Sequence, residues 1–178
     1  ISRVILHPKD PNIIYVAAMG NLFSPNKERG IYKTNNGGKT WKQTLYIDEN
    51  TSAIDIEMHP NNPNKLVAAM WQKSRRGWNF WEGGEKSGVY ISADGGYTWQ
   101  RSTAFPSGEH IGRVGLSISG NTIYALIDNQ KRYTKEKSIS KNLARNSGSR
   151  STCFIIIFAN GSNPFSLAAL ARVFRFGL

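Results

Sequence analysis

The fold is decided by the stretch Gly30-Ile31-Tyr32-Lys33-Thr34-Asn35-Asn36-Gly37-Gly38-Lys39-Thr40-Trp41, which recurs 58 residues later as Gly88-Val89-Tyr90-Ile91-Ser92-Ala93-Asp94-Gly95-Gly96-Tyr97-Thr98-Trp99. Upstream, His7-Pro8-Lys9-Asp10-Pro11-Asn12 recurs as His59-Pro60-Asn61-Asn62-Pro63-Asn64, and Val16-Ala17-Ala18-Met19 recurs as Val67-Ala68-Ala69-Met70. These upstream offsets are 52 and 51 residues, so the second copy carries seven additional residues between Met70 and Gly88. Self-similarity at a nearly constant period indicates a repeat architecture.

Each copy is predicted to form four short strands, because apolar and polar residues alternate and Pro-Asn or Gly-Gly pairs separate the segments. The predicted strands cover residues 3–6, 13–18, 30–34 and 41–47 in the first copy, and residues 53–58, 65–70, 88–92 and 98–103 in the second. A third copy begins with residues 114–118 and 122–126. Four-stranded units of this period are typical of β-propeller blades, of which a closed propeller has about 4–8. The sequence therefore predicts an all-β fold, a partial β-propeller of about two and a half four-stranded blades that belongs to a longer protein.

The turn between the third and fourth predicted strands has the pattern Ser/Thr-x-Asp-x-Gly-x-Thr-Trp. Asp94 is expected to accept hydrogen bonds from nearby backbone N–H groups and so to close the hairpin. The paired glycines supply backbone conformations that other residues resist, and the Trp ring covers the turn. Asn36 replaces the Asp in the first copy and can still accept through its amide oxygen. The predicted structural residues are Thr34, Asn36, Gly38, Thr40 and Trp41 in the first copy, and Ser92, Asp94, Gly96, Thr98 and Trp99 in the second.

On these residues the sequence resembles the Asp-box (BNR) repeat propellers, and most closely the sortilin-N-terminal-like repeat proteins. The resemblance covers residues 1–128. Members of this group include sialidases, xyloglucan-hydrolysing glycosidases, sorting receptors and photosystem assembly factors, so the resemblance implies a fold rather than one activity. It also implies an exported protein, extracellular or periplasmic.

The catalytic sets of these relatives are not carried over, and the catalytic residues stay unassigned. The sialidase Arg-Ile-Pro motif is missing, and no Arg matches the sialidase triad. Xyloglucan-cleaving relatives use paired carboxylates. Asp48, Glu49, Asp55 and Glu57 are candidates by residue type only, and solvated or channel-lining acids are the preferred interpretation.

The repeat pattern ends near residue 130. Nine Lys and Arg residues follow Gln130 against a single acid, Glu136, so this segment carries +8 of the net charge of +11. We expect two regions: a partial propeller at 1–130 and a basic, non-repeat, irregular tail at 131–178. Three interpretations of the tail stay open: a disordered basic segment, non-native sequence such as a misjoined reading frame, and a nucleic-acid-binding arm. Nucleic acid is the least favoured partner, because the repeats themselves are nearly neutral.

A ligand is expected on the loop face of the repeats. The loops at 20–29 and 71–87 lie between second and third strands and share one face, and the Asp-box turns lie on the opposite one. The second loop holds the candidate ligand-binding residues Trp71, Arg75, Arg76, Trp78 and Trp81. Aromatic rings stack on sugars or peptide side chains, and guanidinium groups bind acidic groups. Packing of these aromatics against the next blade, or stacking on single-stranded nucleic acid, are the alternatives.

No cofactor or metal site is predicted. His7 and His59 occupy equivalent positions before Pro and are interpreted as turn residues, and the one cysteine, Cys153, lies in the tail. The longest apolar run, residues 153–159, is too short to span a membrane, which takes about 20 residues.

We therefore expect a fragment of a non-catalytic propeller module that binds a protein, peptide or glycan on its loop face, with the remaining blades in the full-length chain. The alternative is part of a glycoside hydrolase, xyloglucanase- or sialidase-like, with catalytic carboxylates partly outside this fragment.

Overall fold

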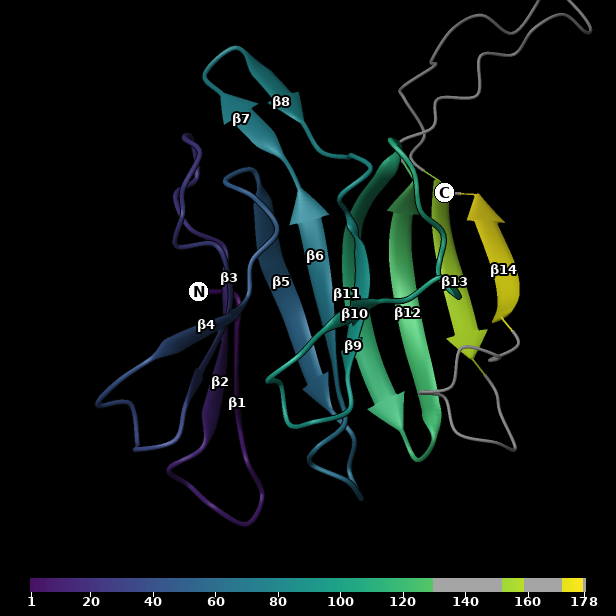
Figure 1. Cartoon of the computed structure of the whole chain (residues 1–178). Coiled ribbons are helices and arrows are strands. Elements are labelled where there is room, and N and C mark those ends of the chain that lie inside the picture. The colour runs from purple at the N-terminus through teal and green to yellow at the C-terminus, as the bar shows by residue number, and fades with distance from the viewer. Residues whose placement is uncertain (130–151, 159–170, 178) are drawn as a thin grey trace, which may run out of the picture.

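The computed structural model of the chain describes residues 1–129, 152–158 and 171–177. The described residues form β-strands joined by turns and loops, without a helix. The strands make three four-stranded antiparallel sheets that stand side by side (Figure 1). No helix in the described residues is long and apolar enough to cross a membrane.

The first two sheets are simple meanders. The first sheet contains β1 (Arg3–Leu6), β2 (Ile14–Ala18), β3 (Gly30–Thr34) and β4 (Lys42–Leu45) in that spatial order. The second contains β5 (Thr51–Met58), β6 (Leu66–Gln72), β9 (Gly88–Ser92) and β10 (Gln100–Arg101). The seven additional residues belong to a separate hairpin of β7 (Ser74–Arg76) and β8 (Asn79–Trp81), which projects from the end of β6 (Figure 1).

The third sheet contains β11 (Ile111–Ser119), β12 (Thr122–Asn129), β13 (Thr152–Phe158) and β14 (Ala171–Gly177). The prediction of an irregular tail from residue 131 is thus wrong for two segments. β13 pairs with β12, and β14 pairs with β13. The physical reason is that residues 153–158 are an apolar, β-branched and aromatic run with high strand propensity. The open edge of β12 offers that run unpaired backbone groups. The predictions for residues 130–151, 159–170 and 178, including the basic arm, lie outside the described residues.

Apart from β7 and β8, which were not predicted as strands, the other strands agree with the sequence prediction except for shifts at their ends. The largest difference is the last strand of the second sheet, predicted at 98–103 and observed only at Gln100–Arg101. The backbone N–H of Thr98 is already bound to Asp94 Oδ1 at 3.0 Å and cannot join the ladder. The turn therefore delays the start of strand pairing.

Two apolar cores hold the sheets together. Tyr15, Ala17 and Ile31 of the first sheet pack against Ile56 and Leu66 of the second, all of them buried. A second core lies between the second and third sheets and includes Val67, Val114 and Ile123. Burying one such aliphatic side chain stabilises a fold by about 1.5–3 kcal/mol, so these contacts fix how neighbouring sheets stack.

The connections between strands divide between two edges of the sheets. At the edge we call the turn edge, Gly37 N donates to Asn12 O at 3.0 Å, and Gly95 N donates to Asn64 O at 2.8 Å. At the opposite edge, the loop edge, Asn26 N donates to Glu49 O at 2.9 Å. Lys73 N donates to the neighbouring Asn50 O at 3.0 Å, so the 20–29 and 71–87 loops both lie at the edge opposite the Ser/Thr-x-Asp/Asn turns, as predicted.

Candidate functional site

The 92–99 turn is closed by its own side chains. Asp94 Oδ1 accepts from the backbone N of Tyr97 and of Thr98, both at 3.0 Å, and Thr98 Oγ1 donates to Asp94 Oδ2 at 2.6 Å. Ser92 Oγ donates to Asp94 Oδ1 at 2.8 Å and accepts from Gly96 N at 2.9 Å. Burial alone would raise the pKa of Asp94, but the hydrogen bonds from Thr98, Ser92 and Tyr97 outweigh it and lower the pKa to about 2.

The 34–41 turn repeats this arrangement with an amide. Asn36 Oδ1 accepts from Thr40 N and from Thr34 Oγ1, both at 2.9 Å, and Asn36 Nδ2 donates to Thr40 Oγ1 at 2.7 Å. A Cβ built on Gly38 would lie 3.5 Å from Cζ2 of Trp41, and one on Gly96 equally close to Trp99, so each Trp ring covers its turn. In both turns the polar side chains form hydrogen bonds within the turn itself, so we interpret the turns as structural elements.

The 92–99 turn also fastens the second sheet to the first. The carbonyl of Gly95 accepts hydrogen bonds from Tyr15 Oη and from Lys33 Nζ, both at 2.9 Å. The Lys33 ammonium lies 3.6 Å from the centre of the Tyr97 ring, and Trp99 Nε1 donates to Thr44 Oγ1 at 3.3 Å. These contacts join segments more than 50 residues apart in the chain.

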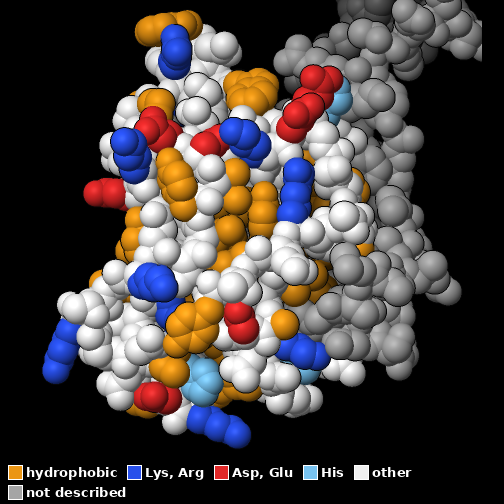
Figure 2. All heavy atoms as spheres, in the orientation of Figure 1, with side chains coloured by type: hydrophobic (Ala, Val, Ile, Leu, Met, Phe, Trp, Pro, Cys, Tyr) orange, Lys and Arg blue, Asp and Glu red, His pale blue; other side chains and the backbone are white. Residues whose placement is uncertain are grey.

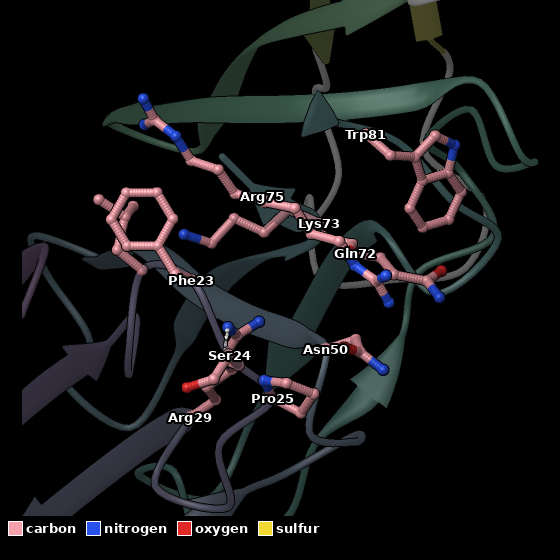
Figure 3. Close-up of a pocket in the computed structure, with 12 residues that line it drawn as sticks. Phe23, Ser24, Pro25, Arg29, Asn50, Gln72, Lys73, Arg75 and Trp81 are labelled. Atoms are coloured by element: carbon pink, nitrogen blue, oxygen red, sulfur yellow. Dashed lines mark hydrogen bonds between the residues drawn. The ribbon is translucent and has the colours of Figure 1, made fainter. Parts of the chain in front are cut away.

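A groove of about 300 Å³ opens on the loop edge. One wall consists of residues 22–25 and Arg29 from the loop between β2 and β3. The other consists of residues 72–76 and Trp81 from the end of β6 and the β7–β8 hairpin, with Asn50 between the two (Figure 3). The groove thus lies between the first and second sheets, and its polar side chains are basic or neutral.

Two basic side chains of the groove are almost completely buried. Arg29 and Lys73 are each 2% exposed. Arg29 Nη2 donates to the carbonyls of Asn21 and Ser24 at 2.9 Å, whereas Nε and Nη1 have no acceptor within the described part of the chain. The Lys73 ammonium lies 5.3 Å from the centre of the Trp71 ring. Burial, followed by the nearby charges of Arg29, Arg75 and Arg113, lowers the pKa of Lys73.

Exposed aromatic rings stand beside these cations. Phe23 is 61% exposed and Trp81 is 46% exposed. The Arg75 guanidinium lies 5.5 Å from the Phe23 ring centre and 5.2 Å from that of Phe80, so it bridges the two loops by cation–π contact. Figure 2 shows hydrophobic and basic side chains together at the tip of the β7–β8 hairpin. The groove can therefore offer both a stacking surface and positive charge.

The structure separates the five residues that the sequence suggested for ligand binding. Arg75, Arg76 and Trp81 line the groove. Trp78 is 83% exposed but does not line it. Trp71 is 6% exposed, packs in the core between the second and third sheets and donates from Nε1 to Glu82 O at 2.6 Å, so a ligand in the groove would not contact it.

Phe23, Arg29 and Lys73 line the groove although the sequence argument did not single them out. All three lie in or beside the two loops assigned to this face. The sequence did predict that these two loops share one face. That prediction makes every residue of either loop a candidate for lining the space between them.

The acidic candidates occupy other surroundings. Asp48 Oδ2 pairs with Lys86 Nζ at 2.7 Å, and Glu57 Oε1 with Arg3 Nη2 at 2.5 Å. Asp55 Oδ2 accepts from Leu116 N at 2.8 Å. Burial raises the pKa of Glu57 despite the opposing effect of Arg3. None of the four acidic candidates lines the groove.

The histidines of the repeats act in turns. His7 Nδ1 accepts from the backbone N of Asp10 at 3.1 Å, and His59 Nδ1 accepts from Asn61 N at 3.1 Å. In the described residues, no three His, Cys, Asp or Glu side chains come together in a way that would hold a metal ion.

Comparison with known proteins adds no name to this arrangement: no protein-family model matches the chain, and no curated protein matches it.

Proposed function

We propose that the chain is part of a non-catalytic Asp-box β-propeller, and that it binds a glycan, peptide or protein ligand in the groove on its loop edge. The observation that carries the proposal is the groove itself, where exposed Phe23 and Trp81 stand beside basic side chains and no acidic residue contributes to the lining. Aromatic faces bind sugar C–H surfaces and peptide side chains, and guanidinium groups fix the orientation of acidic groups.

Equivalent positions in the first two sheets support the propeller arrangement. Ile56 of the second sheet is fully buried by the first sheet, and its repeat equivalent in the first sheet, Val4, is 50% exposed. Trp99 is partly buried against the first sheet, and its equivalent Trp41 is 43% exposed. The outer face of the first sheet thus carries apolar side chains at positions that are buried under a neighbouring sheet in the second. The next blade of a propeller would cover them in the same way.

Binding is tested with the full chain on glycan and peptide arrays, followed by calorimetry on the ligand that binds best. Trp81→Ala is expected to weaken binding about tenfold or more, which corresponds to about 1.4 kcal/mol. Trp41→Ala is the matched control, because Trp41 is about equally exposed but lies on the turn edge. Equal affinity of the two variants, or no saturable ligand, would contradict the proposal.

The alternative function, part of a glycoside hydrolase, rests on Glu57. Its raised pKa suits a general acid, and Asp55 lies on the same strand. A hydrolysis screen with the full-length protein separates the two functions. If the protein hydrolyses a glycan and Glu57→Gln abolishes that activity, the function is that of an enzyme and not of a binding module.

A further inference from the structure

The groove concentrates positive charge that the protein does not neutralise. Arg29 is buried in one wall and Lys73 in the other, and the exposed Arg75 and Arg76 also line the groove. Within the described residues, none of the four makes an ion pair. Such a cluster is unfavourable by itself, because like charges repel each other and burial removes the water that would stabilise them.

The nearest acids do not cancel this charge. Asp48 acts on Arg29, but its carboxylate is paired with Lys86 Nζ at 2.7 Å. Glu82 acts on Arg75 but does not line the groove. The lining therefore carries a net positive charge, because it includes four basic side chains and no acidic one.

A purely structural role accounts for only part of the cluster. Arg29 Nη2 holds the 20–29 loop through the carbonyls of Asn21 and Ser24. That contact uses one of the three guanidinium nitrogens and leaves Nε and Nη1 without an acceptor among the described residues. The Lys73 ammonium makes a cation–π contact with the Trp71 ring. Buried groups without a partner, such as Arg29 Nε and Nη1, call for an explanation, and a bound ligand group is one.

We propose that Lys73, supported by the charge of Arg29 in the opposite wall, forms an oxyanion subsite inside the groove. The subsite binds one sulfate, phosphate or carboxylate group of the ligand. Phe23 and Trp81, which line the same groove (Figure 3), contact the apolar part of that ligand. This inference deepens the proposed function and rests on the same groove.

The subsite is tested on the isotopically labelled full chain by NMR. Sodium sulfate, phosphate and acetate are titrated separately at constant ionic strength, with chloride as the balancing anion. A saturable shift of the backbone amides at residues 22–24 and 72–76 is expected with at least one of them, and the anion that saturates identifies the group. Linear shifts, or shifts spread over the whole chain, with all three anions would overturn the inference.

Lys73→Gln is expected to weaken anion binding at least tenfold, and Lys73→Arg, which keeps the charge, is expected to retain it. Lys39→Gln removes an exposed charge at the turn edge and should leave binding unchanged. An equal loss in Lys73→Gln and Lys39→Gln would overturn the inference, because the effect would then be one of net charge.

These titrations distinguish the subsite from the proposed function. Inorganic anions do not need the aromatic rings, so Trp81→Ala should bind them as the wild-type chain does. If an anion binds saturably but no glycan or peptide ligand is found, the proposed function is overturned and the subsite stands. If no anion binds saturably and Lys73→Gln binds the glycan or peptide ligand as the wild-type chain does, the subsite is overturned and the proposed function stands.

Discussion

At the scale of single residues, Asp94 organises its hairpin through four short contacts. Its two carboxylate oxygens accept from two backbone N–H groups and from the hydroxyls of Ser92 and Thr98. Asn36 makes the equivalent contacts in the first sheet with one oxygen and one amide nitrogen. The charge is therefore not needed to form the turn, but it makes the stability of the second turn depend on pH.

Asp94→Asn is expected to remove that pH dependence. The folded-state pKa of Asp94 is about 2, below the ordinary value of 3.8. The stabilisation is present in full above the unfolded-state pKa, and it is lost as the pH falls from about 4 to about 2. Because Asp94 is exposed, the loss on Asp94→Asn at neutral pH should be about 1 kcal/mol or less.

The measurement is urea unfolding of both chains between pH 2 and pH 7. The difference between their free energies of unfolding should shrink below about pH 4. A difference that stays constant with pH would show that the Asp94 charge does not stabilise the turn.

Residue patterns predicted this turn well, because its hydrogen bonds are local: the acceptor and its donors lie within four residues of each other. They predicted the groove less well. Trp71 and Trp81 are the same residue type in the same loop, so the sequence did not distinguish them as ligand-binding candidates. Trp71, however, directly follows the buried run 66–70 and continues it into the core. Lys73 gives no signal of its burial, because the facing wall of the groove comes from the 20–29 loop, at least 44 residues earlier in the chain.

At the scale of elements, the 92–99 turn connects two sheets that share no backbone ladder. Tyr15 of β2 and Lys33 of β3 both reach Gly95 O across the interface. The sequence predicted the turn and both strands, but this contact depends on how the sheets stack. The β7–β8 hairpin was missed as strands for another reason, since three residues are too few to show alternation.

Tyr15→Phe is expected to destabilise the chain by about 1 kcal/mol through loss of one buried hydrogen bond. Lys33 still donates to Gly95 O, so the carbonyl keeps a partner. Burial, then the charges of Tyr97 and Asp94, raise the pKa of Tyr15 to about 12. The unfolded chain loses the phenolic proton near pH 10 while the folded chain keeps it, so stability falls as the pH rises from about 10 to about 12.

Unfolding measured between pH 8 and pH 11 checks this expectation, with Tyr46→Phe as the control because Tyr46 is 41% exposed. Tyr15→Phe should show a weaker fall in stability above pH 10 than the wild-type chain does. An equal fall in Tyr15→Phe and Tyr46→Phe would mean that Tyr15 is not the group that titrates.

At the scale of the whole molecule, the three sheets leave apolar side chains uncovered on both outer faces. Val4 and Leu6 are 50% and 60% exposed on the first sheet, and Tyr124 and Leu126 are 38% and 48% exposed on the third. The repeat in the sequence predicted several similar four-stranded units, and the exposed faces are those of the first and the last sheet. Exposed apolar side chains gathered on a sheet face favour contact with another protein surface.

The isolated chain is therefore expected to self-associate through its outer sheet faces. Covering Leu6 is worth about 1.5–3 kcal/mol, and a lysine at that position would add the cost of burying a charge. Leu6→Lys should lower the association constant about tenfold or more, equivalent to about 1.4 kcal/mol, in sedimentation velocity over a concentration series. Leu22→Lys is the matched control, since Leu22 is 44% exposed but lies on the loop edge beside the groove. If Leu22→Lys disrupts association as strongly as Leu6→Lys, the sheet faces are not the contact; if the wild-type chain stays monomeric throughout, the outer face of the first sheet does not drive association.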